Sequence, residues 1–290
     1  MIDLHTHSSA SDGKLSPAQL VRYAAEKGVT LLALTDHDTT AGLDEAADEA
    51  QKIGLGFIRG IEITIEWKNG EFHLLGLGLQ RITDEMAALT RFLQDERSKR
   101  NYRIFELLCQ GFFPAMTARE LETDIATVSH TSSVGRPHIA DYLVAHGIVK
   151  KRQEAFDKYL GNGKNYYAKH VGALLESAIC AVRSCGAIPV IAHPMSLYIS
   201  WGAIEGVFAS LQEKGIAGLE CYHPGASETE CKRLVQTAQK QGLYVTAGSD
   251  FHDENSQIGR KIGYSGDGRK IEAEALFCPP LFYGLTELQC

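Results

Sequence analysis

Short apolar runs and amphipathic segments alternate along most of the chain. Runs typical of buried strands are expected at residues 2–4, 30–35, 56–63, 71–79, 187–192, 216–222 and 243–247. Segments with one apolar face, expected as helices, lie between most of them, at residues 18–27, 39–52, 173–184, 201–214 and 227–241. The dipeptide Asn69-Gly70 predicts a hairpin between the third and fourth strands. This alternation predicts a closed or nearly closed (β/α) barrel.

The pattern changes between residues 82 and 169, where charged helical segments replace the alternation. Helices are expected at 84–110, at 117–126, from Pro137 onward and at 149–160. We therefore predict a barrel formed by residues 1–81 and 170–290, interrupted by a helical insertion at residues 82–169. An insertion above a barrel mouth is well placed to act as a lid over the substrate.

The composition narrows the class of protein. The 290 residues are 44% hydrophobic and 22% charged, as in soluble globular enzymes. We expect no membrane span, because no run of about 18 apolar residues occurs, and no signal peptide. Seven scattered cysteines without a CxxC pair are typical of reduced thiols, so we expect a cytoplasmic protein. The net charge of −7 argues against a protein that binds nucleic acid over much of its surface. No obligate protein partner is evident.

Side chains that bind metals cluster at the ends of the predicted strands. His5 and His7 are one residue apart, so on a strand both imidazoles point to the same face. Asp12 follows in a Ser/Gly loop, from which its carboxylate can fold back toward them. The remaining candidates are His37, Glu62, His73, His193, Asp250 and His252. Because strand ends meet at one face of such a barrel, and histidine is the commonest metal ligand, these residues predict a multinuclear metal site.

Together these motifs resemble those of the PHP (polymerase and histidinol phosphatase) phosphoesterases. The matching stretches are Asp3-Leu4-His5-Thr6-His7, Thr35-Asp36-His37-Asp38, Gly60-Ile61-Glu62, Ala192-His193-Pro194 and Gly248-Ser249-Asp250-Phe251-His252. The resemblance implies a distorted seven-stranded (β/α) barrel of the amidohydrolase-like kind. It also implies up to three bound Mn²⁺ ions, with Zn²⁺ or Fe²⁺ as alternatives. Imidazole and carboxylate ligands without thiolates suit such cations.

The resemblance also implies which residues would hold each ion. The first ion would be bound by His5, His7, Glu62 and Asp250. Glu62 would bridge to a second ion, held also by His73 and His193. The third ion would be bound by Asp12, His37 and His252.

Hydrolysis of a phosphate ester follows from such a centre. A hydroxide bridging two metals would be the nucleophile, because the cations lower the pKa of water. The candidate catalytic residues are Glu62, Asp250, His193 and Asp38. Asp38, His193 or water would protonate the leaving oxygen.

The insertion carries two candidate anion sites. Arg97, Arg100 and Arg103 share one face of the helix at 84–110, and arginine is suited to bidentate phosphate binding. The loop 132–135 leads into a helix N-terminus, which favours anions. The simpler interpretations are a solvated charged face and an ordinary capped helix. The candidate substrate-binding residues are Arg97, Lys99, Arg100, Asn101, His130, Arg136 and His138.

Within the PHP family, this organisation resembles the 3′,5′-nucleoside bisphosphate phosphatases and the related 5′→3′ exoribonucleases. The resemblance implies removal of the 3′-phosphate from a substrate such as adenosine 3′,5′-bisphosphate, or trimming of short 5′-phosphorylated RNA. The metals would hold the 3′-phosphate and the lid the 5′-phosphate. The alternatives are a histidinol-phosphate phosphatase and a non-catalytic PHP module of a polymerase assembly.

Overall fold

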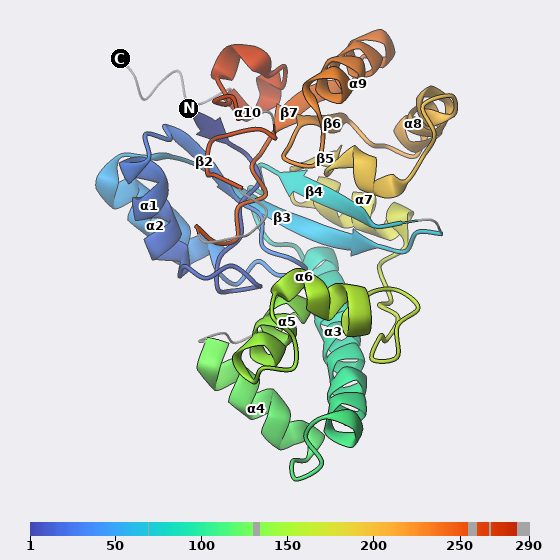
Figure 1. The fold of residues 1–290 in the computed structure, drawn as a ribbon. Coiled ribbons are helices and arrows are strands. Elements are labelled where there is room, and N and C mark those ends of the chain that lie inside the picture. The colour runs from blue at the N-terminus through green and yellow to red at the C-terminus, as the bar shows by residue number, and fades with distance from the viewer. Residues whose placement is uncertain (69, 130–133, 255–259, 267, 283–290) are drawn as a thin grey trace.

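Seven strands form one nearly closed barrel in the computed structural model, which describes residues 1–68, 70–129, 134–254, 260–266 and 268–282 (Figure 1). The strands are β1 (Ile2–Asp3), β2 (Leu31–Leu34), β3 (Gly56–Ile65), β4 (Phe72–Leu77), β5 (Ile188–Ile191), β6 (Gly218–Tyr222) and β7 (Tyr244–Ala247). They follow one another in chain order around the sheet. A parallel bridge between Thr6 and Phe251 links the first strand segment to the last. The predicted seven-stranded barrel is confirmed.

Strand β4 is the exception to the parallel arrangement. It pairs antiparallel with β3 on one side and with β5 on the other, whereas the remaining pairs are parallel. The hairpin predicted before β4 reverses the chain, and it places His73 opposite Thr64. His73 therefore returns to the barrel end at which the parallel strands finish. Asn69 itself lies outside the described residues.

Five helices cover the outside of the barrel. They are α1 (Pro17–Glu26), α2 (Leu43–Ile53), α7 (Leu175–Ser184), α8 (Ile204–Glu213) and α9 (Glu228–Gln241). Ser16 caps α1 through its side chain, and Ser227 caps α9 in the same way. The expectation that Thr39 or Thr40 opens α2 is wrong, because its N-cap is Gly42. A Cβ on Gly42 would lie 2.9 Å from Pro17 Cγ, so close packing on α1 favours glycine there.

The segment between β4 and α7 holds helices with a hydrophobic core of their own. They are α3 (Asp84–Gly111), α4 (Ala118–Ser129), α5 (Arg136–Ala145), α6 (Arg152–Ala155) and the π-helical turn η1 (Phe156–Leu160). Their shared core includes Phe105, Leu121 and Leu143, and it is distinct from the clusters beneath the barrel helices. The helix expected at 149–160 begins later, at Arg152, and changes from α-helical to π-helical winding at Phe156. In Figure 1 these helices lie together on one side of the barrel.

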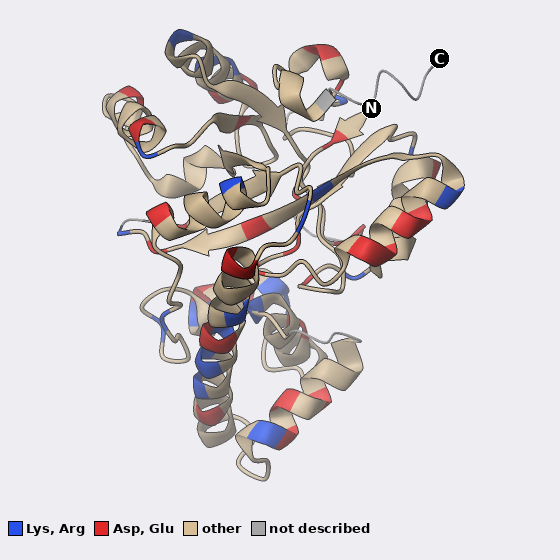
Figure 2. Cartoon of the chain, turned by 180° about the vertical axis from the view of Figure 1, so that it is seen from behind, with Lys and Arg blue, Asp and Glu red and all other residues tan. Residues whose placement is uncertain are grey.

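The long helix α3 carries acidic and basic residues in close succession (Figure 2). No helix in the described ranges has the length and apolar character needed to cross a lipid bilayer. The C-terminal segment adds a short 3₁₀ turn at Ala273–Ala275 and the helix α10 (Pro279–Phe282).

Candidate metal centre

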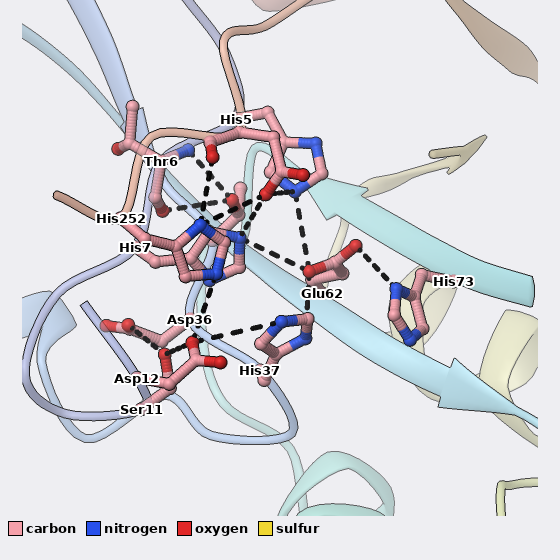
Figure 3. A network of polar contacts seen from close by, with 12 residues as sticks. His5, Thr6, His7, Ser11, Asp12, Asp36, His37, Glu62, His73 and His252 are labelled. Atoms are coloured by element: carbon pink, nitrogen blue, oxygen red, sulfur yellow. Dashed lines mark hydrogen bonds and ion pairs between the residues drawn. The ribbon is translucent and has the colours of Figure 1, made fainter. Parts of the chain in front are cut away.

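Histidine and acidic side chains from strands and from the loops after them gather at one end of the barrel, and Figure 3 shows His5, His7, Asp12, His37, Glu62, His73 and His252 among them. They are His5, His7, Asp12, His37, Glu62, His73, His193, Asp250 and His252, the residues that the sequence predicts as ligands. Their nitrogen and oxygen atoms form four overlapping groups, each with its atoms within 4.8 Å of one another. Each group has the size at which several atoms could coordinate one cation.

The first group joins the N-terminal histidines to the segment after β7. His7 Nε2 lies 3.2 Å from Asp250 Oδ1, and His5 Nε2 lies 3.6 Å from the same oxygen. Glu62 Oε2 lies 3.4 Å from His5 Nε2 and 3.3 Å from His7 Nε2. The four side chains therefore surround one point.

The second group surrounds the other oxygen of Glu62. His193 Nε2 lies 2.9 Å and His73 Nδ1 3.0 Å from Glu62 Oε1, and the two nitrogens are 3.2 Å apart. Glu62 thus faces two groups with its two oxygens, which is the arrangement of a bridging carboxylate.

The third group lies toward the loop after β1. His252 Nε2 is 3.2 Å from Asp12 Oδ1, and His37 Nε2 is 3.9 Å from it. The His7 ring stacks on His252 with centroids 4.0 Å apart, and His37 Nδ1 reaches Glu62 Oε2 at 2.8 Å. His7, His37 and Glu62 each take part in more than one of the four groups, so the cluster is continuous.

The hydrogen bonding of this cluster fits bound cations. Among the described residues, His5 Nε2, both nitrogens of His7, His37 Nδ1 and Glu62 Oε2 are buried and form no hydrogen bond, although His37 Nδ1 and Glu62 Oε2 lie 2.8 Å apart. Buried polar atoms normally have a partner, so this many exceptions in one place need an explanation. Divalent cations bound by imidazole and carboxylate would supply the missing partners.

The ionisation of the cluster agrees with this interpretation. Burial, helped by the neighbouring His252 and His37, lowers the pKa of His7 to about 3, which keeps its ring neutral. Burial would also lower the pKa of His73, but the Glu62 carboxylate outweighs it and raises the pKa to about 9. Burial acts likewise on His252, where Asp12 and Asp250 raise the pKa to about 9. Without cations, protons therefore compensate the carboxylates.

Buried carboxylates behind the cluster hold its histidines and loops in place, a role that their sequence context does not predict. Glu220 on β6 contacts His5 Nδ1 at 2.9 Å, and its second oxygen accepts a hydrogen bond from His193 N at 2.7 Å. Asp36 accepts hydrogen bonds from Ser8 N at 2.7 Å and from Ser11 Oγ at 2.6 Å. A lone glutamate inside the apolar run of β6 was the signal that could have identified Glu220.

Two further contacts of this kind involve the segment after β7. Asp3 accepts hydrogen bonds from Ser249 N at 2.9 Å and from Gly263 N at 2.7 Å. Arg260 contacts Asp250 Oδ2, so the other oxygen of Asp250 is the one that faces His7. These contacts fix the orientation of Asp250 relative to the first strand.

The carboxylate of Asp38 is already engaged by neighbouring hydrogen-bond donors. Its side chain accepts hydrogen bonds from Thr64 N at 2.8 Å and Thr64 Oγ1 at 3.0 Å, and from Arg97 Nη2 at 2.6 Å. Burial would raise the pKa of Asp38, but Arg97 and these hydrogen bonds lower it. Asp38 is thus an ionised anchor between the barrel and α3. Its predicted part in protonating the leaving oxygen stays a prediction.

The predicted substrate-binding arginines differ from Lys99 in their surroundings. Arg97 and Arg100 on α3 are largely buried, and Arg136 at the start of α5 pairs with Glu71 of the barrel at 3.1 Å. Lys99 lies apart from them, because its side chain is exposed and pairs with Glu96 on the same helix.

The other predicted contacts have local partners. Asn101 Nδ2 donates to Val134 O at 2.5 Å, which ties α3 to the segment before α5. His138 is buried, and its Nδ1 accepts a hydrogen bond from Gly135 N at 2.9 Å. Arg103 is exposed and pairs with Glu106, so the shared arginine face does not extend to it. His130 and the serines of the adjoining loop lie outside the described residues.

The profile of the PHP domain matches residues 3–161. The chain belongs to the PHP family. It is 34% identical over 266 residues, covering 92% of both chains, to a 3′,5′-nucleoside bisphosphate phosphatase of Chromobacterium violaceum. It is 35% identical to a 5′-3′ exoribonuclease of Haemophilus influenzae, covering 86% of this chain and 89% of the relative. A protein of Bifidobacterium adolescentis that is assigned by inference as a metal-dependent phosphoesterase has the same fold, with a TM-score of 0.76 and 29% identity over 99% of this chain and 95% of that one.

These likenesses confirm the predicted family and the predicted class of enzyme. The protein is a PHP-family hydrolase of phosphoric esters, and its activity depends on metal ions. The likeness extends through the segment between β4 and α7 as well as through the barrel, since it covers nearly the whole chain.

Proposed function

We propose that this PHP enzyme removes the 3′-phosphate from nucleoside 3′,5′-bisphosphates and releases 5′-nucleotides. In this proposal the nine predicted ligands hold three Mn²⁺ ions, with Zn²⁺ or Fe²⁺ as alternatives, grouped as the family resemblance implies. The bound cations would neutralise the scissile phosphate and activate water for attack on phosphorus. Helices α3 to α6 would form the lid over the substrate.

The observation that carries the substrate assignment is the environment of Arg100. Its side chain is only 7% exposed, and no carboxylate forms an ion pair with it in the described part of the chain. Its Nη2 donates instead to Asn101 Oδ1 at 2.8 Å. Burial, with the neighbouring Arg97 and Arg136, lowers the pKa of Arg100 to about 9. A buried cation without a counter-ion is costly, so the site favours an anionic ligand.

The second phosphate of the proposed substrate would supply that anion. Arg97 is the link to the metal centre, because its partner Asp38 donates its own N–H to Glu62 O at 2.8 Å. Arg97 is thus connected to β3, the strand that carries Glu62, through a single residue, Asp38. A nucleoside 3′,5′-bisphosphate has two phosphates at the ends of one ribose, which suits two adjacent anion sites. Arginine is also the side chain best suited to bidentate phosphate binding.

Short 5′-phosphorylated RNA is the second candidate substrate. The Haemophilus influenzae relative is named an exoribonuclease. A 3′-phosphodiester presents an equivalent P–O bond next to the same 5′-phosphate. In this variant of the proposal, the enzyme would release a 5′-nucleotide and a shortened RNA.

The test is a substrate panel with the Mn²⁺-loaded enzyme. We expect phosphate release from adenosine 3′,5′-bisphosphate to be much faster than from 3′-AMP, 5′-AMP or histidinol phosphate. A 5′-phosphorylated dinucleotide examines the RNA alternative by release of 5′-nucleotide. Comparable rates on all the phosphomonoesters would refute the assignment.

Arg100→Ala and Arg103→Ala form a matched pair on the same helix. Charge-assisted hydrogen bonds contribute about 1.5–3 kcal/mol, so Arg100→Ala should lower kcat/KM for the bisphosphate about 10- to 150-fold. The rate on 3′-AMP should change little. Arg103→Ala removes an exposed side chain and should leave both rates unchanged. Equal losses on both substrates in Arg100→Ala would contradict a role in binding the 5′-phosphate.

A further inference from the structure

His170 is a buried histidine that neither the sequence motifs nor the metal cluster explains. It lies in the segment that returns from η1 to the barrel, and its side chain is 17% exposed. Both ring nitrogens are shielded from solvent, and neither forms a hydrogen bond within the described part of the chain. Such an imidazole is unfavourable unless a ligand supplies its partner.

The position of His170 is fixed by the barrel. Three residues further on, Ala173 N donates to Thr64 O and Glu66 N donates to Ala173 O, each at 2.8 Å. A Cβ on Gly172 would lie 2.4 Å from Ile65 C, so only glycine permits this close approach to β3. The backbone beside His170 is therefore held against β3, the strand that carries Glu62.

The charged and titratable groups facing His170 are Arg100, Arg97, Asp38 and His73. Asp38 Oδ2 lies 4.0 Å from His170 Nε2, beyond hydrogen-bond distance, and it already accepts hydrogen bonds from Thr64 and Arg97. Burial and the nearby Arg100 lower the pKa of His170, so its ring is neutral and retains one N–H donor. A neutral donor beside two buried guanidinium groups is complementary to an anion.

We propose that His170 donates a hydrogen bond to the 5′-phosphate of the substrate and thereby selects substrates that carry it. The inference rests on the proposed function. It adds to that anion site a contact from the segment that returns from η1 to the barrel. Arg97 and Arg100 would contact the phosphate from α3, and His170 would contact it from the side of β3. In this proposal His170 is a specificity-determining residue.

The experiment compares His170→Ala with Lys169→Ala, whose side chain is exposed in the same segment. The Mn²⁺-loaded enzymes are assayed on adenosine 3′,5′-bisphosphate and on 3′-AMP, with kcat and KM determined separately. Binding of 5′-AMP, which carries only the 5′-phosphate, is measured by calorimetry. We expect His170→Ala to lower kcat/KM for the bisphosphate and the affinity for 5′-AMP about 10- to 100-fold. The rate on 3′-AMP and the metal content should be unchanged, and Lys169→Ala should behave as the wild type.

Two further variants separate hydrogen bonding from packing. His170→Phe fills a similar volume without a donor and should show the same selective loss, even if the alanine variant does not fold. His170→Asn retains an N–H donor and should recover part of the discrimination. Equal losses on both substrates, or unchanged binding of 5′-AMP in His170→Phe, would overturn the inference. If the wild type itself hydrolyses both substrates equally, the proposed function fails as well. If the wild type prefers the bisphosphate and the His170 variants keep the same preference, only the role of His170 is refuted.

Discussion

Replacing Glu220 with glutamine should weaken metal binding at His5 while leaving the fold intact. Glu220 contacts His5 Nδ1 at 2.9 Å and accepts the His193 N–H at 2.7 Å. A carboxylate only accepts hydrogen bonds, so His5 Nδ1 must carry the ring proton, which leaves Nε2 free to bind a cation. Nε2 is the atom that faces Glu62 and Asp250.

Glutamine cannot satisfy both contacts in the same way. Because the backbone N–H of His193 is a fixed donor, the glutamine oxygen must accept from it. The amide NH₂ then faces His5 Nδ1 and favours the tautomer with the proton on Nε2, where the cation should bind. Loss of such an outer partner typically costs about 10- to 100-fold in metal affinity.

The assay is a calorimetric Mn²⁺ titration, supported by metal analysis after dialysis and by thermal unfolding. Glu205→Gln is the matched control, because Glu205 is exposed on α8 and pairs with Lys240 at the surface. It should bind Mn²⁺ as the wild type does. If Glu220→Gln is folded and all its sites keep wild-type affinity, the tautomer argument is wrong.

Three further predictions concern ionisation and packing. Since the pKa values of His73 and His252 are raised to about 9 in the metal-free protein and that of His5 is also raised, binding of cations at pH 7 should release on the order of three protons. Calorimetry in buffers of different ionisation enthalpy measures this release, and affinity should fall as the pH is lowered; pH-independent binding would contradict it. Asp38→Ala leaves the buried Arg97 unpaired and should cost about 3–5 kcal/mol in urea unfolding, so a loss below about 1 kcal/mol would show that the pair is not structurally important. Leu143→Ala removes a fully buried side chain from the core of α3 to α6 and should cost about 2–5 kcal/mol, with Mn²⁺ affinity unchanged; loss of metal binding would show that this core supports the barrel site.

The elements of the barrel could be predicted because their signals are local. Buried strands such as 31–34 are continuous apolar runs, and the helices between them have capping residues and one apolar face. The two departures from the expected helices have different causes. The start of α2 depends on how tightly Gly42 packs against α1, and the π-helical turn after α6 leaves no clear periodic signal.

The sequence alone was sufficient to place the predicted metal ligands at strand ends, because strand direction decides which barrel end they occupy. The phosphoesterase prediction came from the resemblance of these motifs to the PHP family. Only the tertiary structure decided which atoms meet. His5 and Glu220 are 215 positions apart, and Arg97 meets Asp38 across 59 positions. Such partners depend on strand register and barrel closure, which hydropathy does not encode. The same holds for His170, whose surroundings arise only where the return segment, α3 and β3 come together.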